Sequence, residues 1–244
     1  MIPNKLPYFS RTTSSWDGDV INKNPSREHL RFWVQNCNGI KINDDSNTNH
    51  NFTQLHEYGV NYFSFTESNV NTSNAAAISK LHRIFRSRFK SGRMAITNTP
   101  DFPRSTSYQL GGVFSGCDGT LNSRFIKSEH DDLGRWHCHT LRGKQKDIKI
   151  YTVYRVHRKT DDTAGLSSAW MQQRSRLRQQ NGLTNPRDDI INNLVATIRK
   201  DINSNKSVIL MGDFNESIDS REQTHVKLSD LGMVNLMEER FEST

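Results

Sequence analysis

Val208-Ile-Leu-Met-Gly-Asp-Phe-Asn215 is the stretch of sequence that decides the fold. Its first four residues form a short, continuous apolar run, which is typical of a strand buried on both faces of a sheet. Asp213 and Asn215 follow where this strand ends. Strand ends in α/β proteins are where polar groups leave an apolar core, so an Asp and an Asn two positions apart can address one ligand. A plain turn also explains an isolated Gly-Asp-Phe-Asn, because Gly, Asp and Asn all favour turns.

A helix is expected directly before this strand. Asn185 suits the N-cap, Pro186 suits the first helical position, and Asp188 and Asp189 lie near the positive end of the helix dipole. The apolar residues that recur at helical spacing are Ile190, Leu194, Ile198 and Ile202. The pattern predicts a helix over residues 186–202 with one buried stripe.

Two further β-prone runs end in polar residues that carry chemistry. Residues 30–35 lead into Gln35-Asn36-Cys37-Asn38-Gly39, and residues 61–66 lead into Glu67. With the first run, three strand ends thus deliver Asn36, Asn38, Glu67, Asp213 and Asn215. Carboxylate oxygens suit a hard cation such as Mg²⁺, and neutral amides can hydrogen-bond an anionic phosphate without charge repulsion.

A second amphipathic helix is predicted over residues 75–90, with a strongly basic outer face. The cations on that face are Lys80, Arg83, Arg86 and Lys90. No acidic residue lies between Glu67 and Asp101. A solvated helix face is the usual explanation of such a charge run, but the absence of compensating acids favours contact with nucleic-acid phosphates.

The rest of the chain reads as short strands separated by turns and two polar stretches. The expected strands are residues 94–97, 108–115, 123–127, 135–141 and 147–154, forming antiparallel hairpins. Residues 43–51 are expected as a polar loop, 52–58 as a short helix, and 161–185 as a polar loop with a short helix over 169–179. His137 and His139 alternate with Trp136 and Cys138; a polar strand face explains them better than a metal site, because no third ligand stands at useful spacing.

The composition bounds the possible partners and compartments. The 244 residues include 33 Lys and Arg against 26 Asp and Glu, and the net charge of +7 suits a polyanion such as nucleic acid or an acidic membrane surface. Three scattered cysteines favour a reducing compartment over a disulfide framework. Without a signal peptide or an apolar run long enough for a membrane span, the protein is expected to be soluble and intracellular. Residues 1–28 are expected to be a loose polar leader before one domain at 29–244.

The polar motifs together resemble the endonuclease/exonuclease/phosphatase superfamily, closest to the endonuclease domain of non-LTR retrotransposons. The motifs that carry the resemblance are, in order, Gln35-Asn-Cys-Asn-Gly39, Thr66-Glu67, Gly111-Gly-Val-Phe-Ser115, Val153-Tyr-Arg155 and Gly212-Asp-Phe-Asn215. The resemblance implies an α/β (α+β) four-layer sandwich of two packed, mostly antiparallel or mixed β-sheets flanked by helices. Apurinic endonucleases usually show Asp where this chain has Asn38, whereas retrotransposon endonucleases resemble the Asn-x-Asn-Gly motif found here. This motif and the pair Tyr154-Arg155 therefore favour the retroelement branch.

The resemblance also implies a role for each site residue. Glu67 is similar to the main metal ligand, with Asn36 a partner at the metal or the phosphate, and the cofactor is Mg²⁺ or alternatively Mn²⁺. Asp213 would orient or deprotonate the attacking water. Asn215 and Tyr154 would hydrogen-bond the phosphate. The residues expected to contact nucleic acid are Asn38, Lys80, Arg83, Arg86, Lys90 and Arg155. The product would carry a 3′ hydroxyl that primes reverse transcription, which implies DNA as partner, a reverse transcriptase domain in the same polyprotein, and a nuclear location.

The sequence departs from the family pattern after Asn215. Family members end with a Ser-Asp-His motif, whereas here Ser229-Asp230 is followed by Leu231, and His225 lies too near Asn215. Truncation is the expected reason, with the last strands of one sheet missing, and the 244-residue chain is expected to bind DNA weakly and to nick plasmid barely, if at all. The stretch at 161–185 is also unexplained by the resemblance. Two alternatives therefore stay open: a phosphatase or phosphodiesterase of the same fold acting on a small phosphate, and a non-catalytic remnant that binds nucleic acid.

Overall fold

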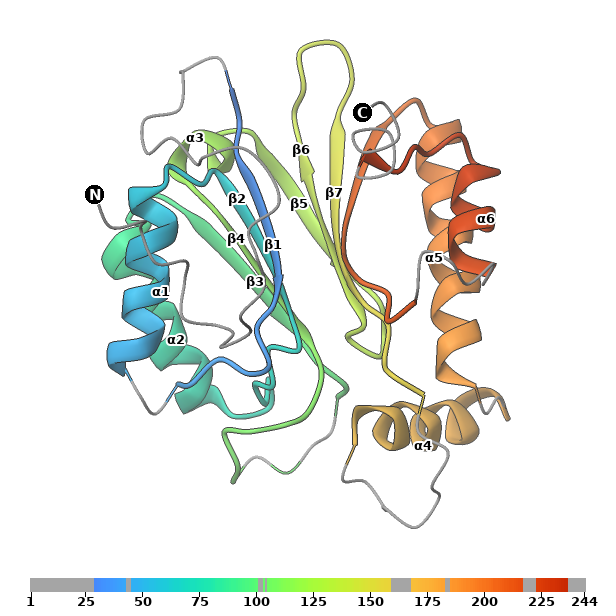
Figure 1. The fold of residues 1–244 in the computed structure, drawn as a ribbon, viewed down its shortest axis with the longest axis horizontal. Helices are drawn as coiled ribbons and strands as arrows, with labels where there is room; N and C mark the ends of the chain where they lie inside the picture. Colours follow the sequence, from blue (N-terminus) through green and yellow to red (C-terminus); the bar gives the residue numbers. More distant parts are fainter. Residues whose placement is uncertain are drawn as a thin grey trace, which may run out of the picture.

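Two four-stranded β-sheets pack face to face, and helices cover their outer faces (Figure 1). This computed structural model describes residues 29–42, 45–100, 103, 105–158, 168–182, 185–216 and 223–236. The expected polar leader, residues 1–28, lies outside the described residues. The α/β sandwich of two mixed sheets flanked by helices is the architecture that the family resemblance implies.

The first sheet is built by the first half of the chain. Its strands, in spatial order, are β1 (Phe32–Asn36), β2 (Tyr62–Thr66), β4 (Val113–Cys117) and β3 (Arg93–Thr97). β1 and β2 are parallel because α1 (Asp45–Glu57) connects them, whereas β4 is antiparallel to both of its neighbours. α1 and α2 (Ala75–Arg88) cover the outer face of this sheet.

The second sheet is built by the second half of the chain, after the short helix α3 (Gly119–Asn122). Its strands, in order, are β5 (Phe125–His130), β6 (Trp136–Leu141), β7 (Ile148–Tyr154) and β8 (Ser207–Asp213). The first three form antiparallel hairpins, and β8 joins β7 in parallel after α4 (Ala169–Asn181) and α5 (Pro186–Asn203). α5 and α6 (Gln223–Ser229) cover its outer face (Figure 1).

Three local predictions are wrong, each for a physical reason. α1 begins at Asp45, so residues 45–51 are helical where a polar loop is expected. The sequence of α1 is a weak helix former, and the helix is stabilised because Phe52 and Leu55 are buried against the sheet. β4 begins only at Val113, because Gly111 and Gly112 have φ of 92° and 79°, outside the range of a regular strand. All seven residues of β8 are half-buried rather than buried on both faces, since among the described residues β8 is the last strand of its sheet.

The layer between the sheets changes from apolar to polar along its length. At one end it contains Tyr62, Leu141 and Ile150, and toward the ends of β2 and β7 it becomes polar. The buried polar residues there are Ser64, Thr66, Ser115, His137, His139 and Thr152. Tyr62, Ser115, His137 and His139 form hydrogen bonds within this layer, whereas the buried hydroxyls of Ser64 and Thr66 have no partner among the described residues.

The two histidines on β6 lie inside this polar layer rather than on an exposed strand face. His137 Nε2 contacts the Ser115 hydroxyl, and His139 Nδ1 lies 3.2 Å from the Tyr62 hydroxyl. Burial lowers the pKa of His139 to about 4 and lowers the pKa of His137 well below its ordinary value. Both imidazoles are therefore neutral hydrogen-bonding groups of the core at neutral pH.

Candidate active site

Two strand ends, from different sheets, finish in the same kind of side-chain turn. Asn36 Oδ1 accepts a hydrogen bond of 3.0 Å from the backbone N–H of Asn38, and Asp213 Oδ1 accepts one of 2.9 Å from the backbone N–H of Asn215. Short Asn and Asp side chains favour such turns because they bond the backbone two residues later. Each turn stops its strand and leaves a polar side chain at the rim of the sandwich.

A chain of contacts brings these residues together across the two sheets. Asn36 Nδ2 donates a hydrogen bond of 2.8 Å to Asp213 Oδ2. Tyr154 pairs in register with Asp213 at the ends of β7 and β8, and its hydroxyl donates a hydrogen bond of 2.9 Å to Glu67 Oε1. The predicted residues Asn36, Glu67, Tyr154, Asp213 and Asn215 thus lie at one rim, and we call them the strand-end cluster.

The backbone around this cluster adopts the left-handed region at several residues that are not glycine. Their φ values are 44° at Asn38, 51° at Glu67, 53° at Asn69 and 49° at Asn215. Asn adopts this region readily, but Glu does so rarely, and each such residue costs on the order of 1 kcal/mol or more. The Glu67 carbonyl accepts a 2.7 Å hydrogen bond from the Gly39 N–H, and this bond stabilises the strained backbone conformation of Glu67. Strain of this kind concentrates at functional sites.

Tyr154 is held in the protonated form that its hydrogen bond to Glu67 requires. The side chain is buried, and burial raises the pKa of its hydroxyl far above the ordinary value; the nearby Glu67 carboxylate raises the pKa further, and Asp213 adds to the effect. Tyr154 is therefore a neutral donor at any physiological pH. A neutral phenol can also donate to a phosphate oxygen without losing its proton.

Buried charged side chains inside the protein hold the segment that carries Asp213 and Asn215. The guanidinium of Arg155 pairs with the Glu216 carboxylate, and both side chains are at most 10% exposed. Arg187, in the first turn of α5, donates to the carbonyls of Val156 at 3.0 Å and Asn215 at 3.1 Å. This buried set, which we call the arginine clamp, consists of Arg155, Arg187 and Glu216.

The structure places Arg155 differently from the expectation that it contacts nucleic acid. Only 5% of the residue is exposed, and its guanidinium also donates to the Arg187 carbonyl at 3.2 Å. Its backbone N–H donates to the Asp213 carbonyl at 2.9 Å, and its carbonyl accepts a 2.7 Å hydrogen bond from Asn215 Nδ2. Arg155 is occupied in shaping the loop after β8, because its buried side chain points to partners inside the protein.

The predicted basic residues lie on the outer helix layer rather than at the rim. Arg83 and Arg86 are exposed on α2 and Lys80 is half-buried there, whereas Lys90 is exposed just after the helix ends. α2 covers the outer face of the first sheet (Figure 1), so this charge lies behind the strands rather than at their ends. Asn38, by contrast, is exposed directly beside the strand-end cluster.

Comparison with solved structures identifies this arrangement of sheets and helices. No protein-family model and no curated protein matches the sequence. The AP endonuclease from Archaeoglobus fulgidus aligns over 86% of this chain and 74% of its own, with a TM-score of 0.52 and 15% identity. The chain has the endonuclease/exonuclease/phosphatase fold.

Two further solved structures with this fold align over most of the chain. The endonuclease/exonuclease/phosphatase family protein from Leptotrichia buccalis covers 84% of this chain and 73% of its own, with a TM-score of 0.47 and 12% identity. D. rerio TDP2 complexed with single strand DNA product covers 88% and 71%, with a TM-score of 0.43 and 12% identity. Identities this low leave substrate and mechanism to be argued from the site.

The oxygen atoms of the strand-end cluster are chemically suited to a hard divalent cation. Glu67 accepts from Tyr154 through Oε1, and no described residue bonds its Oε2. Asp213 uses both oxygens, toward Asn36 and Asn215, so its carboxylate is oriented but keeps lone pairs. Among the described residues no three His, Cys, Asp or Glu side chains cluster as a metal site. Glu67 and Asp213 are the carboxylates of the cluster whose oxygens suit such a cation.

A cavity of about 390 Å³ opens beside the cluster, and the sequence alone did not point to it. Glu67 and Tyr154 line one side, and Trp170 of α4 lines another. Asn69 also lines it and fixes its floor, since Asn69 Oδ1 accepts a 2.8 Å hydrogen bond from the Gly111 N–H. The sequence does contain a signal for Asn69: it stands two residues after Glu67, the spacing seen from Asn36 to Asn38 and from Asp213 to Asn215.

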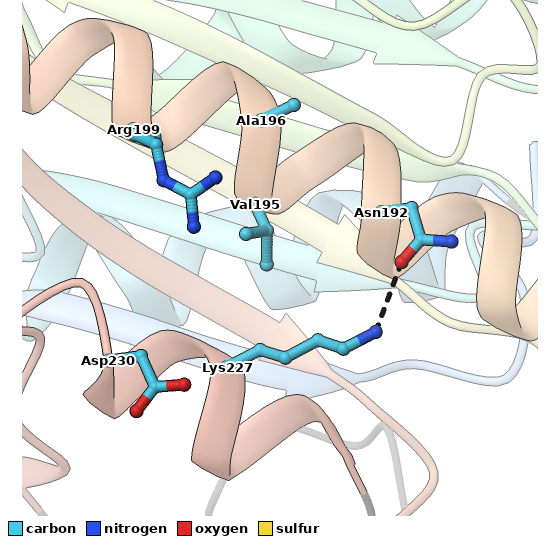
Figure 2. Close-up of a pocket in the computed structure, with 6 residues that line it drawn as sticks. All are labelled: Asn192, Val195, Ala196, Arg199, Lys227 and Asp230. Carbon is cyan, nitrogen blue, oxygen red and sulfur yellow. Dashed lines mark hydrogen bonds between the residues drawn. The ribbon is translucent and has the colours of Figure 1, made fainter.

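A second hollow, of about 250 Å³, lies between α5 and α6, away from the cluster (Figure 2). Lys227 reaches from α6 toward α5, and its Nζ donates to Asn192 Oδ1 at 3.0 Å. Arg199 and Asp230 also line the hollow. None of the predicted site residues borders it, and its open, mixed-charge walls select no ligand.

Proposed function

We propose that this protein is a metal-dependent phosphodiester hydrolase that nicks DNA. One observation carries the proposal: two carboxylates that lie 146 residues apart in the sequence, Glu67 and Asp213, are drawn to one rim through Tyr154 and Asn36. The two residues have different neighbours and so can take different roles. Glu67 faces a neutral phenol, whereas Asp213 is oriented by an amide and a backbone N–H.

The reaction that suits this arrangement is in-line hydrolysis. Asp213 accepts a proton from a water molecule as the water oxygen bonds to phosphorus. The bond from phosphorus to the 3′ oxygen breaks on the opposite side, and that oxygen leaves as a hydroxyl after taking a proton from solvent. Asn215, Tyr154 and Asn38 supply neutral donors for the phosphate oxygens. Most of the rate would come from positioning and charge stabilisation.

Mg²⁺, with Mn²⁺ as a substitute, is the cation proposed for Glu67, and when bound it would neutralise charge that develops on the phosphate. The residues of this chain orient the groups that act on the phosphate. Tyr154 holds Glu67 in one orientation, and Asn36 holds Asp213. The arginine clamp keeps the Asn215 carbonyl and side chain in place.

DNA is the proposed substrate, in a retroelement context. The support is the net charge of +7, the basic face of α2, and a fold shared with an AP endonuclease. The Asn-x-Asn-Gly motif at Asn36 to Gly39 and the Tyr154-Arg155 pair resemble the motifs of retrotransposon endonucleases. A 3′ hydroxyl at the nick would prime reverse transcription, with the reverse transcriptase in the same polyprotein and the reaction in the nucleus. Within the described residues, no helix has the length and apolar character to cross a bilayer.

A phosphatase acting on a small phosphate ester is the second candidate. The cavity beside Glu67 favours it, because a compact ligand could sit there without a surrounding groove. The two functions differ in substrate size. A DNA nickase converts supercoiled plasmid to open circles, whereas a phosphatase releases inorganic phosphate from a monoester.

Plasmid nicking with the protein in excess tests the proposal. The wild type is expected to nick in Mg²⁺ and to lose nicking on chelation, and Glu67→Gln is expected to lower the rate at least about 100-fold. Glu57→Gln is the matched control, because Glu57 is exposed at the end of α1, before β2 rather than after it. Equal nicking by wild type and Glu67→Gln would refute the assignment. DNA binding without any nicking would favour the non-catalytic remnant.

A further inference from the structure

We propose that the end of the sandwich opposite the strand-end cluster is an anchoring surface for the phosphate backbone of nucleic acid. Its principal residues are Arg93, Arg124 and Arg142, which we call the far-end arginines. The inference goes beyond the proposed function, because this surface would hold nucleic acid at a place where the candidate active site does not cut it.

Strand direction places the far-end arginines away from the cluster. Arg93 starts β3 and pairs with Cys117 at the end of β4, which pairs in turn with Tyr62 at the start of β2. Glu67 follows the other end of β2. Arg142 lies in the hairpin between β6 and β7, and β7 then runs over seven residues, roughly 23 Å, toward the cluster. This hairpin extends at the end of the molecule opposite α4 (Figure 1).

Phe125 brings the three arginines together. The guanidinium carbon of Arg93 lies 3.7 Å from the centroid of the Phe125 ring, and Arg93 Nε donates a 2.9 Å hydrogen bond to Asn122 Oδ1. Arg124 directly precedes Phe125, and its carbonyl accepts a 2.7 Å hydrogen bond from the Arg142 N–H. All three arginines are exposed. Neutral groups therefore position these cations and leave their charge available to a ligand.

Carboxylates do not neutralise this surface within the part of the chain that the structure describes. Residues 119–128 and 133–146 contain no Asp or Glu. Asp118 borders the first segment and accepts a 2.8 Å hydrogen bond from Asn61 Nδ2. Asp147 borders the second and pairs with Lys206 at 2.7 Å. Arginine side chains without a carboxylate partner match the oxygens of phosphate groups, which they can bind through two parallel hydrogen bonds.

The basic face of α2 leads to this surface rather than to the rim of the candidate active site. α2 ends at Arg88, and Arg93 begins the next strand. Asn122, which positions Arg93, also donates a 2.8 Å hydrogen bond to the Ser91 carbonyl in the turn between them. Because Arg93 covers the Phe125 ring, that ring is not available for stacking on a base. We therefore expect contacts with phosphates, which carry no sequence information.

Duplex binding in a chelator tests the surface without any cutting. Fluorescence anisotropy of a labelled duplex of about two helical turns gives the affinity and its salt dependence. The double variant Arg124→Gln, Arg142→Gln should weaken binding at least about tenfold, because it loses charge-assisted hydrogen bonds. It should also flatten the slope of log affinity against log salt by about 2 units, close to 0.9 for each phosphate contact. The control Arg199→Gln, Lys200→Gln removes the same charge from α5 and should change both quantities much less.

Hydrogen exchange locates the contact on the full chain. Adding the duplex should slow amide exchange at residues 122–126 and 141–143 in the wild type and not in the double variant. Polyglutamate is the competitor that represents an acidic protein partner. Displacement of the duplex by polyglutamate at equal charge concentration would overturn the assignment to nucleic acid. Equal losses of affinity in the double variant and the control, or slower exchange only at the rim, would overturn the surface itself.

Nicking measurements separate this inference from the proposed function. Plasmid nicking by the double variant should show a KM raised about tenfold and an unchanged kcat, because neither arginine contacts the strand-end cluster. A lower kcat with KM unchanged would contradict an anchoring role. A wild type that binds duplex through the far-end arginines but never nicks would refute the proposed function and support the anchoring surface.

Discussion

The side-chain amide of Asn36 donates a 2.8 Å hydrogen bond to the carboxylate of Asp213, although 177 residues separate the two in the sequence. The contact joins the end of β1 to the end of β8 and so ties one sheet to the other at the candidate active site. It also makes Asn36 a positioning residue for Asp213, besides the part at the metal or phosphate that the family resemblance suggests.

Asn36→Asp is predicted to shift the pH dependence of hydrolysis. The change would place two carboxylates at hydrogen-bond distance, and like charges that close disfavour ionisation of both. Initial rates measured against pH should show the acid limb moving to higher pH, with the plateau rate less affected. Asn61→Asp is a geometric control, because Asn61 Nδ2 donates a 2.8 Å hydrogen bond to Asp118 at the opposite end of β2. A shift of the profile in the control, or none in Asn36→Asp, would contradict the assignment of Asp213 as the base.

Glu216→Gln is predicted to destabilise the fold by about 3 kcal/mol, because it leaves the buried guanidinium of Arg155 without its counter-charge. Urea unfolding measures the effect. Asp147→Asn removes a carboxylate from the more exposed pair with Lys206, whose side chains are 32% and 29% exposed, and should change stability by less than about 1 kcal/mol. Similar losses in the two variants would mean that the arginine clamp contributes no more than a surface ion pair.

Arg187→Lys is predicted to reduce activity more than stability. Lysine keeps the charge but cannot reproduce the two hydrogen bonds to the carbonyls of Val156 and Asn215. Loss of the second bond releases the Asn215 segment, so kcat should fall about tenfold or more while KM changes little. Steady-state kinetics with methyl p-nitrophenyl phosphate, a small phosphodiester, together with a urea unfolding curve, separates the two effects. A fall in stability with kcat intact would assign Arg187 a purely structural role.

The fold is predicted to lose stability in mild acid because of its buried histidines. His139 has a pKa of about 4 in the folded state, below the unfolded value near 6.5, so protons bind the unfolded chain better over that interval. The contribution of His139 to the free energy of unfolding is complete above pH 6.5 and is lost as the pH falls toward 4. The loss amounts to about 2 kcal/mol between pH 7 and 5. Urea unfolding at several pH values should show this slope, and His139→Gln should reduce it. His82→Gln, on the exposed side of α2, should leave the slope unchanged.

The basic face of α2 is predicted to contribute to DNA affinity through counterion release. Changing Lys80, Arg83, Arg86 and Lys90 to Gln should flatten the slope of log affinity against log salt by at most about 3 to 4 units. The control removes four exposed cations from other positions: Lys144, Lys146, Arg199 and Lys200. Equal changes in both variants would show that overall charge, and not this helix, governs binding, and an unchanged slope would mark the face as solvated surface.

The architecture was predicted by the resemblance of the ordered motifs to a known family, whereas the strand-end cluster could be inferred from the residues themselves. Asn36, Glu67 and Asp213 each follow a β-prone run, and strand ends are where such residues meet. The helix at residues 186–202 was also predictable, since its cap is local, and Asn185 does accept from the Arg187 N–H at 3.1 Å.

The parts that could not be predicted depend on contacts between distant segments. Residues 45–51 have a polar, loop-like composition and become helical only because Phe52 and Leu55 are buried against the first sheet. The burial of Arg155 depends on Glu216, and no spacing rule links those two positions. The cavity arises from α4 meeting the end of β2, which the sequence of either element does not reveal.

The division of the strand-end cluster between the two sheets has a consequence for biosynthesis. The first sheet is complete once residue 117 has been made, and it holds Asn36 and Glu67. Tyr154 and Asp213 belong to the second sheet and leave the ribosome later. A growing chain therefore carries two of the five cluster residues while more than ninety further residues are made, without the groups that complete the cluster. Under the proposed function, hydrolysis would require residues of both sheets, so the nascent chain is expected to be inactive until β8 has been made.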